Sequence, residues 1–402
     1  MTQVFSLQKP LAGIKVVELS TMITASLATM MLADQGAEVI KVEAITGDPL
    51  RLLGTSSNGI SAMFTNCNRG KKSVAVDLKD TKAQEAVRQM IKEADVVIHN
   101  FRPGVMDRLG LGSEQLRAEN PSLVFVEING FGKEGPLANA PAYDSVIQAL
   151  SGLTAVQSNN DQPGFMKTLL CDKVTAYTAW QAITAALFAR ERSQDKTGQH
   201  IDISMLHAML AFMWPDCMAN ETFLDEDIPK SPNIADVFWV TTVRDGHVSI
   251  MAATDDQWAG VFRILGKPEL IDDARYADLY GRMKHIGELR EMMNAGFAKF
   301  TLKELLARLR EEDVPGTECL DRESAITHPQ VNALELVEKH ACDVMGSLRA
   351  IAPPVSFEGQ RGSAGRPAPK LGFHTRECLS AIGLSADELD AFAQEKRIFL
   401  AS

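Results

Sequence analysis

The chain has 402 residues and a formal net charge of −11 at pH 7, a length that accommodates two or three domains with substantial cores. Apolar residues make up 45% and charged residues 23% of the sequence, which excludes a wholly disordered chain. The acidic balance argues against nucleic acid as the main ligand but leaves anionic small molecules open, because a small site needs only a few local cations.

The first half alternates strand and helix patterns. Strands are expected at residues 14–19, 38–42, 73–76, 95–99 and 123–128, with helices at 21–35 and 81–94. This alternation predicts an α/β fold with a mostly parallel sheet. Such sheets bind ligands at the carboxyl ends of their strands.

A long amphipathic helix is expected at residues 173–192, followed by a strand at 200–204 and a buried apolar helix at 205–219. The pattern then changes. A linker-like acidic stretch precedes a hairpin candidate at 237–243 and 247–251, and helices follow at 255–265 and 284–309. Residues 225–325 are therefore a candidate small domain, and a last helix begins near 385.

The six cysteines lie far apart and include no CxxC pair, so we interpret them as reduced thiols of a cytoplasmic protein. The N-terminal residues lack a basic region followed by an apolar stretch, as a secretory leader would have. No apolar run approaches the ~20 residues of a membrane span, so we expect no membrane partner.

Common cofactor motifs are missing from the sequence. The turn after the first strand has no GxGxxG, and the chain contains no P-loop, no GxSxG elbow and no HExxH. These absences weaken a nicotinamide, flavin, ATP or α/β-hydrolase interpretation. We expect no metal and no tightly bound cofactor.

Two short segments carry binding chemistry. The basic cluster Asn68-Arg69-Gly70-Lys71-Lys72-Ser73 precedes a strand and is either a solvated turn or a site for an anionic ligand's phosphates. The segment at residues 100–104 follows a predicted parallel strand directly, where nucleotide ligands lie. The alternative there is an ordinary Pro-Gly turn.

Asp172 stands at the start of the long helix. Local chemistry favours an N-cap role, since Asp is among the best capping residues. A helix N-terminus is also expected to lower the pKa of a carboxyl group and keep it ionised. An ionised carboxylate can serve as a nucleophile that forms a covalent acyl intermediate, so both roles stay open.

At this point the sequence resembles the class III CoA-transferases, a family that also includes α-methylacyl-CoA racemase. Nearly the whole chain carries the resemblance, in segments that include LADQGAEVIKVE (32–43), NRGKKSVAVDLK (68–79), ADVVIHNFRPGVMDRLGLG (94–112), AYDSVIQALSG (142–152), DKVTAYTAWQAITAALFARE (172–191), KTGQHIDISML (196–206) and APKLGFHTRECL (368–379).

The resemblance implies a Rossmann-like large domain at residues 1–220 that binds CoA, an inserted α+β domain at 225–325, and a C-terminal segment at 326–402 that returns to the large domain. Members form interlocked homodimers. Coenzyme A and acyl-CoA are substrates, and CoA moves from a thioester to a free carboxylic acid. Asp172 matches the aspartate that the family acylates.

The family's CoA site carries over to particular residues. Met22 and Ile23 match positions that line the CoA, and Lys71 and Lys72 match the basic segment near its phosphates. Asn100, Phe101 and Arg102 match the turn beside pantetheine and nucleotide, and Leu109 matches a residue that packs on adenine.

Two features depart from the family pattern, and a third bears on the choice between transferase and racemase. Ala44 stands where the family often has Arg, and residues 220–236 show no glycine-rich lid of the formyl-CoA transferase type. Tyr143 stands where the racemases have a catalytic His. A phenol, with an ordinary pKa of about 10, is a poor base at neutral pH, so transferase is favoured over racemase. A catalytically silent CoA-binding protein is the third alternative.

Overall fold

A computed structural model describes residues 9–158 and 162–401. Its main sheet has seven strands in the order β16-β5-β2-β1-β6-β7-β8. The strands are β1 (Lys15–Leu19), β2 (Glu38–Glu43), β5 (Lys72–Val76), β6 (Val96–His99), β7 (Val124–Asn129), β8 (His200–Ser204) and β16 (Ile398–Phe399). Every neighbouring pair from β5 to β8 is parallel, and β16 alone runs antiparallel, against β5. The expected α/β fold with a mostly parallel sheet is confirmed.

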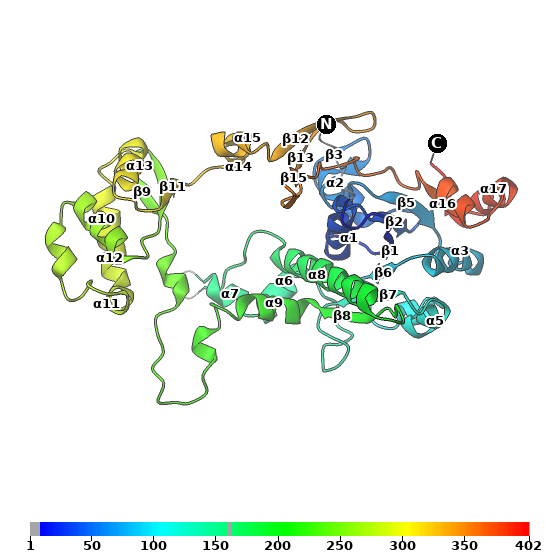
Figure 1. Ribbon diagram of the computed structural model, residues 1–402, viewed down its shortest axis with the longest axis horizontal. Coiled ribbons are helices and arrows are strands. Elements are labelled where there is room, and N and C mark those ends of the chain that lie inside the picture. The colour runs from blue at the N-terminus through cyan, green and yellow to red at the C-terminus, as the bar shows by residue number, and fades with distance from the viewer. Residues whose placement is uncertain (1–8, 159–161, 402) are drawn as a thin grey trace. The chain divides into compact units, whose positions relative to one another are not determined.

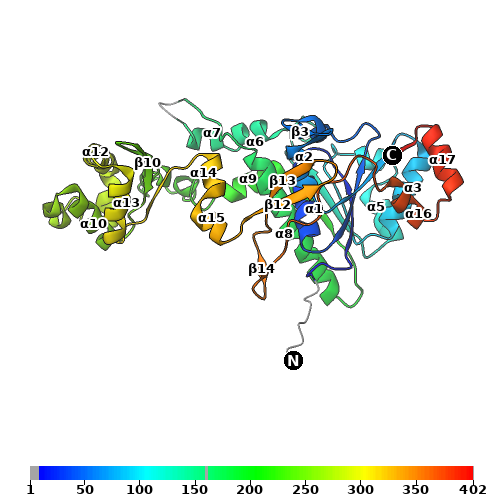
Figure 2. The same ribbon diagram turned by 90° about the horizontal axis from the view of Figure 1, so that it is seen from above.

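Helices cover both faces of this sheet (Figures 1 and 2). One face carries α1 (Thr24–Asp34) and α8 (Leu170–Arg192), and the other carries α3 (Thr81–Lys92), α5 (Ser113–Glu119), α16 (Thr375–Ala381) and α17 (Ala386–Gln394). The central strands are buried along nearly their whole length. That burial explains why β6 and β7 are largely apolar rather than alternating in sequence.

The strand order reverses direction at β1. From β1 the chain proceeds outward through β2 and β5 and then returns to place β6 on the other side of β1. Such a switch point opens a crevice at the carboxyl ends of the two strands. The topological switch point therefore lies between the ends of β1 and β6, and we expect a ligand to bind there.

The C-terminal tail completes the core of this sheet unit. Leu379 and Leu389 of α16 and α17, together with Ile398 of β16, belong to the same buried cluster as Val74 and Val76 of β5. Burying a large aliphatic side chain contributes about 1.5–3 kcal/mol. The tail is thus part of the sheet unit's core rather than an appendage.

Contacts divide the chain into two compact units. The first comprises the described residues up to Phe212 and from Leu334 onward, and the second runs from Met213 to Ala333; the expected boundaries were 220–225 and 325–326. The second unit has its own core around Trp258 and Phe262. It contains β9 (Thr241–Val243), β10 (Gly246–Ile250), β11 (Gly316–Glu318), α10 (Asp255–Leu265), α11 (Leu279–Lys284), α12 (Ile286–Phe297), α13 (Leu302–Glu311), α14 (Arg322–Thr327) and α15 (Pro329–Ala333).

Two expectations for helices are wrong. The single helix expected at 284–309 is divided into α12 and α13, because Thr301 and Glu304 form a capping box that starts a new helix. The helix expected at 205–219 ends earlier, as α9 (Met205–Met213), and its Phe212 is 56% exposed in the single chain. The hairpin expected near residue 245 is confirmed by the β9–β10 pairing.

The remaining elements are short. They are α2 (Ala62–Asn68), α4 (Val105–Arg108), α6 (Asp144–Leu150), α7 (Leu153–Val156), β3 (Ser56–Ser57), β4 (Ile60–Ser61), β12 (Val337–Cys342), β13 (Gly346–Ile351), β14 (Ser356–Phe357) and β15 (Gln360–Arg361). Within the described ranges, no helix has the length and apolar character needed to cross a membrane.

Candidate active site

The turns after β1 and β6 are joined side by side at the switch point. The Asn100 side chain accepts a hydrogen bond from the Thr21 backbone N–H at 3.1 Å and donates one to the Thr21 carbonyl at 2.8 Å. This pair of bonds fixes the turn that begins at Asn100 against the turn that contains Met22. The expected residues Met22, Ile23 and Asn100 are therefore brought together.

Met22 has a strained backbone. Its φ of 65° lies in the left-handed region, which costs a residue other than glycine roughly 1–3 kcal/mol. The Asp48 carboxylate compensates by accepting the Met22 N–H at 3.1 Å, and Lys41 in turn pairs with Asp48 at 3.0 Å. Such strained positions cluster at functional sites.

Asp172 lies in the first turn of α8, but it does not cap the helix. The N-cap residue is Leu169, which makes no side-chain capping bond, so the expected capping role of Asp172 is wrong. The Asp172 carboxylate instead accepts a hydrogen bond from the Thr24 hydroxyl at the start of α1. This contact places Asp172 beside the turn that follows β1.

The expected lowering of the Asp172 pKa is also wrong. Burial raises the pKa of Asp172; the hydrogen bond from Thr24 opposes this shift, and the charge of Asp144 adds to it. Burial therefore outweighs the helix dipole, which stabilises a charge by about 0.3–1 kcal/mol at an exposed helix end. A carboxylate with a raised pKa is more basic and hence a better nucleophile when ionised.

Asp144 is a further residue of the candidate site, which the sequence analysis missed. Its carboxylate is buried and accepts the Asp172 backbone N–H at 3.1 Å, so it satisfies a free donor at the start of α8. Gln148 donates to the other Asp144 oxygen at 2.6 Å and also bonds the backbone of Met166 and Thr168. The hydrogen bonds of Asp144 and Gln148 thus fix the position of the segment that carries Asp172.

No local signal could have revealed the hydrogen bond between Asp144 and the Asp172 backbone, because the two residues lie 28 positions apart in the sequence. The same holds for Thr24, which is 148 positions from Asp172. Tyr143 directly precedes Asp144, and its side chain is 69% exposed. Within the described part of the chain, the Tyr143 hydroxyl makes no hydrogen bond.

The other residues expected near CoA differ in accessibility. Arg102 is exposed and has no ion-pair partner among the described residues, so its guanidinium is available to an anion. Phe101 packs partly into the core, with its ring 6.0 Å from that of His99. Leu109 follows α4 and is also partly buried against the core.

The basic cluster at residues 68–73 is neither a solvated turn nor an open site for an anionic ligand. The Lys71 ammonium is fully buried and donates to Glu18 at 2.8 Å, to the Ser26 carbonyl at 2.7 Å and to Asn68 at 2.7 Å. These bonds use all three of its donors. Lys72 is partly exposed and pairs with Glu38 at 2.5 Å and Glu377 at 2.9 Å. The geometry thus leaves Lys71 no free donor for a phosphate.

Glu18 is the centre of a buried ionic network. Lys41 and Lys71 each approach one of its oxygens at 2.8 Å. Although burial raises the pKa of Glu18, the two lysines hold it well below its usual value. Burial lowers the pKa of Lys71 to about 8, with Glu18 opposing that shift.

The described residues contain no group of three or more His, Cys, Asp or Glu side chains that could hold a metal ion.

Comparisons with known proteins agree with this architecture. The profile of CoA-transferase family III matches residues 11–375. A succinate–glutarate CoA-transferase of Agrobacterium fabrum is 32% identical over 397 residues, covering 95% of this chain and 98% of that protein. An acetyl-CoA:oxalate CoA-transferase of Acetobacter aceti is 32% identical, covering 90% and 93% of the two chains.

Solved structures give the same match. The crystal structure of a CAIB/BAIF family protein from Brucella suis superposes with a TM-score of 0.79 at 30% identity, covering 93% of this chain and all of that chain. The structure of Rv3272 from Mycobacterium tuberculosis gives a TM-score of 0.79 at 27% identity, covering 92% and 98%.

Proposed function

The chain belongs to CoA-transferase family III, and we propose that it transfers CoA between carboxylic acids through a covalent intermediate on Asp172. The observation that carries the proposal is the setting of this carboxylate: one oxygen accepts from Thr24, and burial together with Asp144 raises the pKa. The other oxygen makes no hydrogen bond within the described residues. It is therefore the nucleophilic atom.

In the first half-reaction, the free Asp172 oxygen attacks the carbonyl carbon of the donor thioester. A C–O bond forms, the C–S bond breaks, and CoA leaves as the thiolate, which gives a mixed anhydride. The thiolate then attacks the aspartyl carbonyl carbon. The anhydride C–O bond breaks, the donor acid leaves as its carboxylate, and Asp172 carries CoA as a thioester.

The second half-reaction reverses these steps with the acceptor. An acceptor carboxylate attacks the aspartyl thioester, expels the thiolate and forms a second anhydride. The thiolate attacks the acceptor's carbonyl carbon and returns Asp172 as a carboxylate. Since one thioester replaces another, the cycle needs no ATP. The crevice between the turns after β1 and β6 would hold CoA.

Within that crevice, Met22, Ile23, Asn100 and Phe101 would line the CoA and Leu109 would contact its adenine. Arg102 is our principal candidate for a phosphate contact, because it is exposed and has no ion-pair partner among the described residues. Lys72 would contribute only after loosening its ion pairs. Lys71 supports the site from within the core.

We propose short dicarboxylates and their CoA thioesters as substrates. The relatives' names specify succinate, glutarate and oxalate. Tyr143, exposed beside Asp144, would position the thioester or the acceptor by its hydroxyl group. This assignment differs from that of a racemase, where the residue would remove an α-proton.

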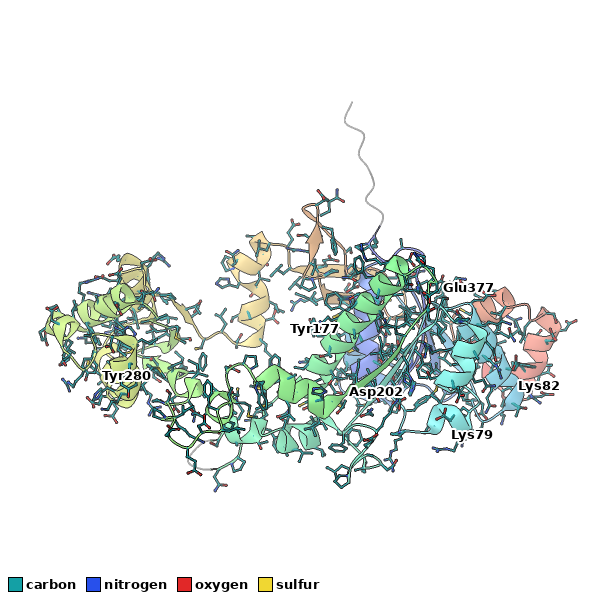
Figure 3. All side chains as sticks on the ribbon, turned by 60° about the horizontal axis from the view of Figure 1, so that its bottom comes forward. Lys79, Lys82, Tyr177, Asp202, Tyr280 and Glu377 are labelled. Carbon is teal, nitrogen blue, oxygen red and sulfur yellow. The ribbon has the colours of Figure 1, made fainter. Side chains whose placement is uncertain are left out.

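We also propose that the protein acts as a homodimer. Large apolar side chains on α8 and α9 are exposed in the single chain: Tyr177 by 51%, Phe188 by 65% and Phe212 by 56%. Figure 3 labels Tyr177, which stands out from α8. Exposed apolar surface of this kind is typical of a protein interface. Light scattering should give twice the chain mass of 43.9 kDa.

The function is tested by a transfer screen of the purified protein. Succinyl-, acetyl- and formyl-CoA are each incubated with glutarate, oxalate and other carboxylic acids, and new thioesters are identified by mass spectrometry. We expect transfer from at least one donor, and its loss in Asp172→Asn. Incubation of 2-methylacyl-CoA in heavy water should give no deuterium at the α-carbon; rapid incorporation would make the protein an isomerase.

A further inference from the structure

A cavity of about 470 Å³ lies beside α4 and α5, over β6, β7 and β8. Its lining includes His99, Arg117, Phe125, Glu127, Lys133 and His200, and it excludes Met22, Asn100 and Asp172. The volume falls in the range of about 300–1,000 Å³ that is typical of small-molecule sites. The proposed transfer reaction makes no use of this cavity.

His99 is the most informative residue in the lining. It is only 2% exposed, and neither ring nitrogen has a hydrogen-bond partner, whereas buried polar groups are nearly always paired. Phe125 packs edge-on against the ring at 5.4 Å and fixes its orientation. Burial lowers the pKa of His99 to about 4. The neutral ring therefore offers one donor and one acceptor to a ligand.

Arg117 supplies a second unused donor. Its Nε atom is buried without a partner, while its terminal nitrogen donates to the Gly198 carbonyl at 3.1 Å. Lys133, by contrast, is already engaged: it pairs with Glu127 at 3.0 Å and with Asp202 of β8 at 3.1 Å. Figure 3 labels Asp202 on this strand. The unused hydrogen-bonding capacity thus lies with His99 and Arg117.

The charge of the lining selects against an anion. Three carboxylates, those of Asp107, Glu114 and Glu127, face two cations, Arg117 and Lys133. Three aromatic rings also line the cavity: Phe125, which is itself only 1% exposed, contacts the ring of His99 at 5.4 Å and that of His200 at 5.2 Å. A flat, uncharged molecule with its own donors and acceptors matches this combination.

We propose that this cavity is a second ligand site, which binds an uncharged planar nitrogen heterocycle of nucleobase size through His99 and Arg117. The ring would lie beside the Phe125–His200 pair and exchange hydrogen bonds with the His99 imidazole and the Arg117 Nε–H. The site is separate from the CoA crevice, and its occupancy does not depend on Asp172.

The test measures binding of adenine, adenosine and nicotinamide to the full chain by ligand-observed NMR and calorimetry. We expect at least one probe to bind wild type and to bind Asp172→Asn equally well. His99→Phe should weaken binding at least tenfold. The matched control is His207→Phe, which alters an exposed histidine on α9 outside the cavity.

His99→Phe removes an unpaired buried group, so it should fold at least as stably as wild type; should it fail to fold, Arg117→Met provides the same test. Saturating CoA should leave probe binding unchanged. Failure of all three probes, equal binding by His99→Phe or Arg117→Met, or displacement of the probe by CoA would overturn the proposal. The transfer assay of Asp172→Asn does not depend on any of these results, so failure of the second ligand site can be told apart from failure of the proposed transfer function.

Discussion

Two neighbours act on the Asp172 carboxylate: Thr24 donates a hydrogen bond to it, and Asp144 carries a charge of the same sign. Thr24 stabilises the ionised carboxylate, whereas burial and the neighbouring Asp144 destabilise it. The two neighbours therefore move the pKa in opposite directions, and the proposed transfer reaction requires the ionised form. Activity should fall as the pH decreases through the pKa of Asp172.

Thr24→Val should lower kcat/KM and shift its acid limb to higher pH. The substitution keeps the shape of the side chain but removes the hydrogen bond that lowers the pKa of Asp172. A hydrogen bond to a charged group is worth about 1.5–3 kcal/mol, so at pH values below the pKa of Asp172 we expect kcat/KM to fall roughly ten- to a hundredfold, because less of the carboxylate is ionised. An unchanged pH profile of kcat/KM would show that Thr24 does not act on Asp172.

Asp144→Asn should shift the same limb to lower pH. The variant removes the charge that raises the pKa of Asp172 but keeps an oxygen that can accept the Asp172 N–H. Asp225→Asn, an exposed acid in the segment after α9, is the control. A shift to higher pH, or equal shifts in both variants, would contradict the electrostatic role of Asp144.

At the scale of elements, the network around Glu18 joins β1 to β2 and to the segment between α2 and β5. Lys41 comes from β2, and Lys71 directly precedes β5. Removing one partner of a buried pair leaves uncompensated charge in the core, which is strongly destabilising. This network fixes the elements that carry Met22 and Thr24.

Glu18→Gln should therefore destabilise the protein by about 3–5 kcal/mol. Chemical denaturation followed by far-UV circular dichroism measures the effect. Glu93→Gln is the control, since Glu93 forms an exposed pair with Lys15 at 3.6 Å and should change stability by no more than about 0.5 kcal/mol. Equal effects of the two substitutions would show that the network around Glu18 stabilises the protein no more than an exposed ion pair does.

Local patterns predicted the elements better than the partners of their side chains. The strands of the sheet follow from apolar runs, and α10 begins and ends at the expected residues. The role of Lys71 did not follow, because its partner Glu18 is 53 positions away. Asp172 was expected to cap α8 for the same reason: a capping rule uses neighbouring residues, while Asp144 reaches the helix through tertiary structure.

At the scale of the whole molecule, each unit has a hydrophobic core of its own. Phe297, Leu305 and Val261 are fully buried within the second unit. In the first unit, the tail contributes the edge strand β16 to the sheet and residues of α17 to the core. The parallel sheet was predictable from alternating strands and helices, and the family's CoA chemistry from the resemblance. The switch point at β1 was not predictable, because it depends on the order of the strands in the sheet, which alternation leaves open.

The second unit, Met213–Ala333, should fold as an isolated fragment. Its core draws on residues from within that range alone. We expect cooperative thermal unfolding and a near-UV circular dichroism signal from Trp258, which is 6% exposed. Leu305→Ala should lower the stability of the fragment by about 2–5 kcal/mol; a fragment without a cooperative transition would show that this core needs the rest of the chain.

The central claim, that Asp172 carries CoA during turnover, is tested most directly by trapping. The protein is incubated with the acyl-CoA donor found in the screen, without acceptor, and is then treated with hydroxylamine and digested for peptide mass spectrometry. The account predicts a hydroxamate on Asp172 that appears only with the donor and is absent from Asp172→Asn. A modification on another residue, or none in an enzyme that is turning over, would contradict it.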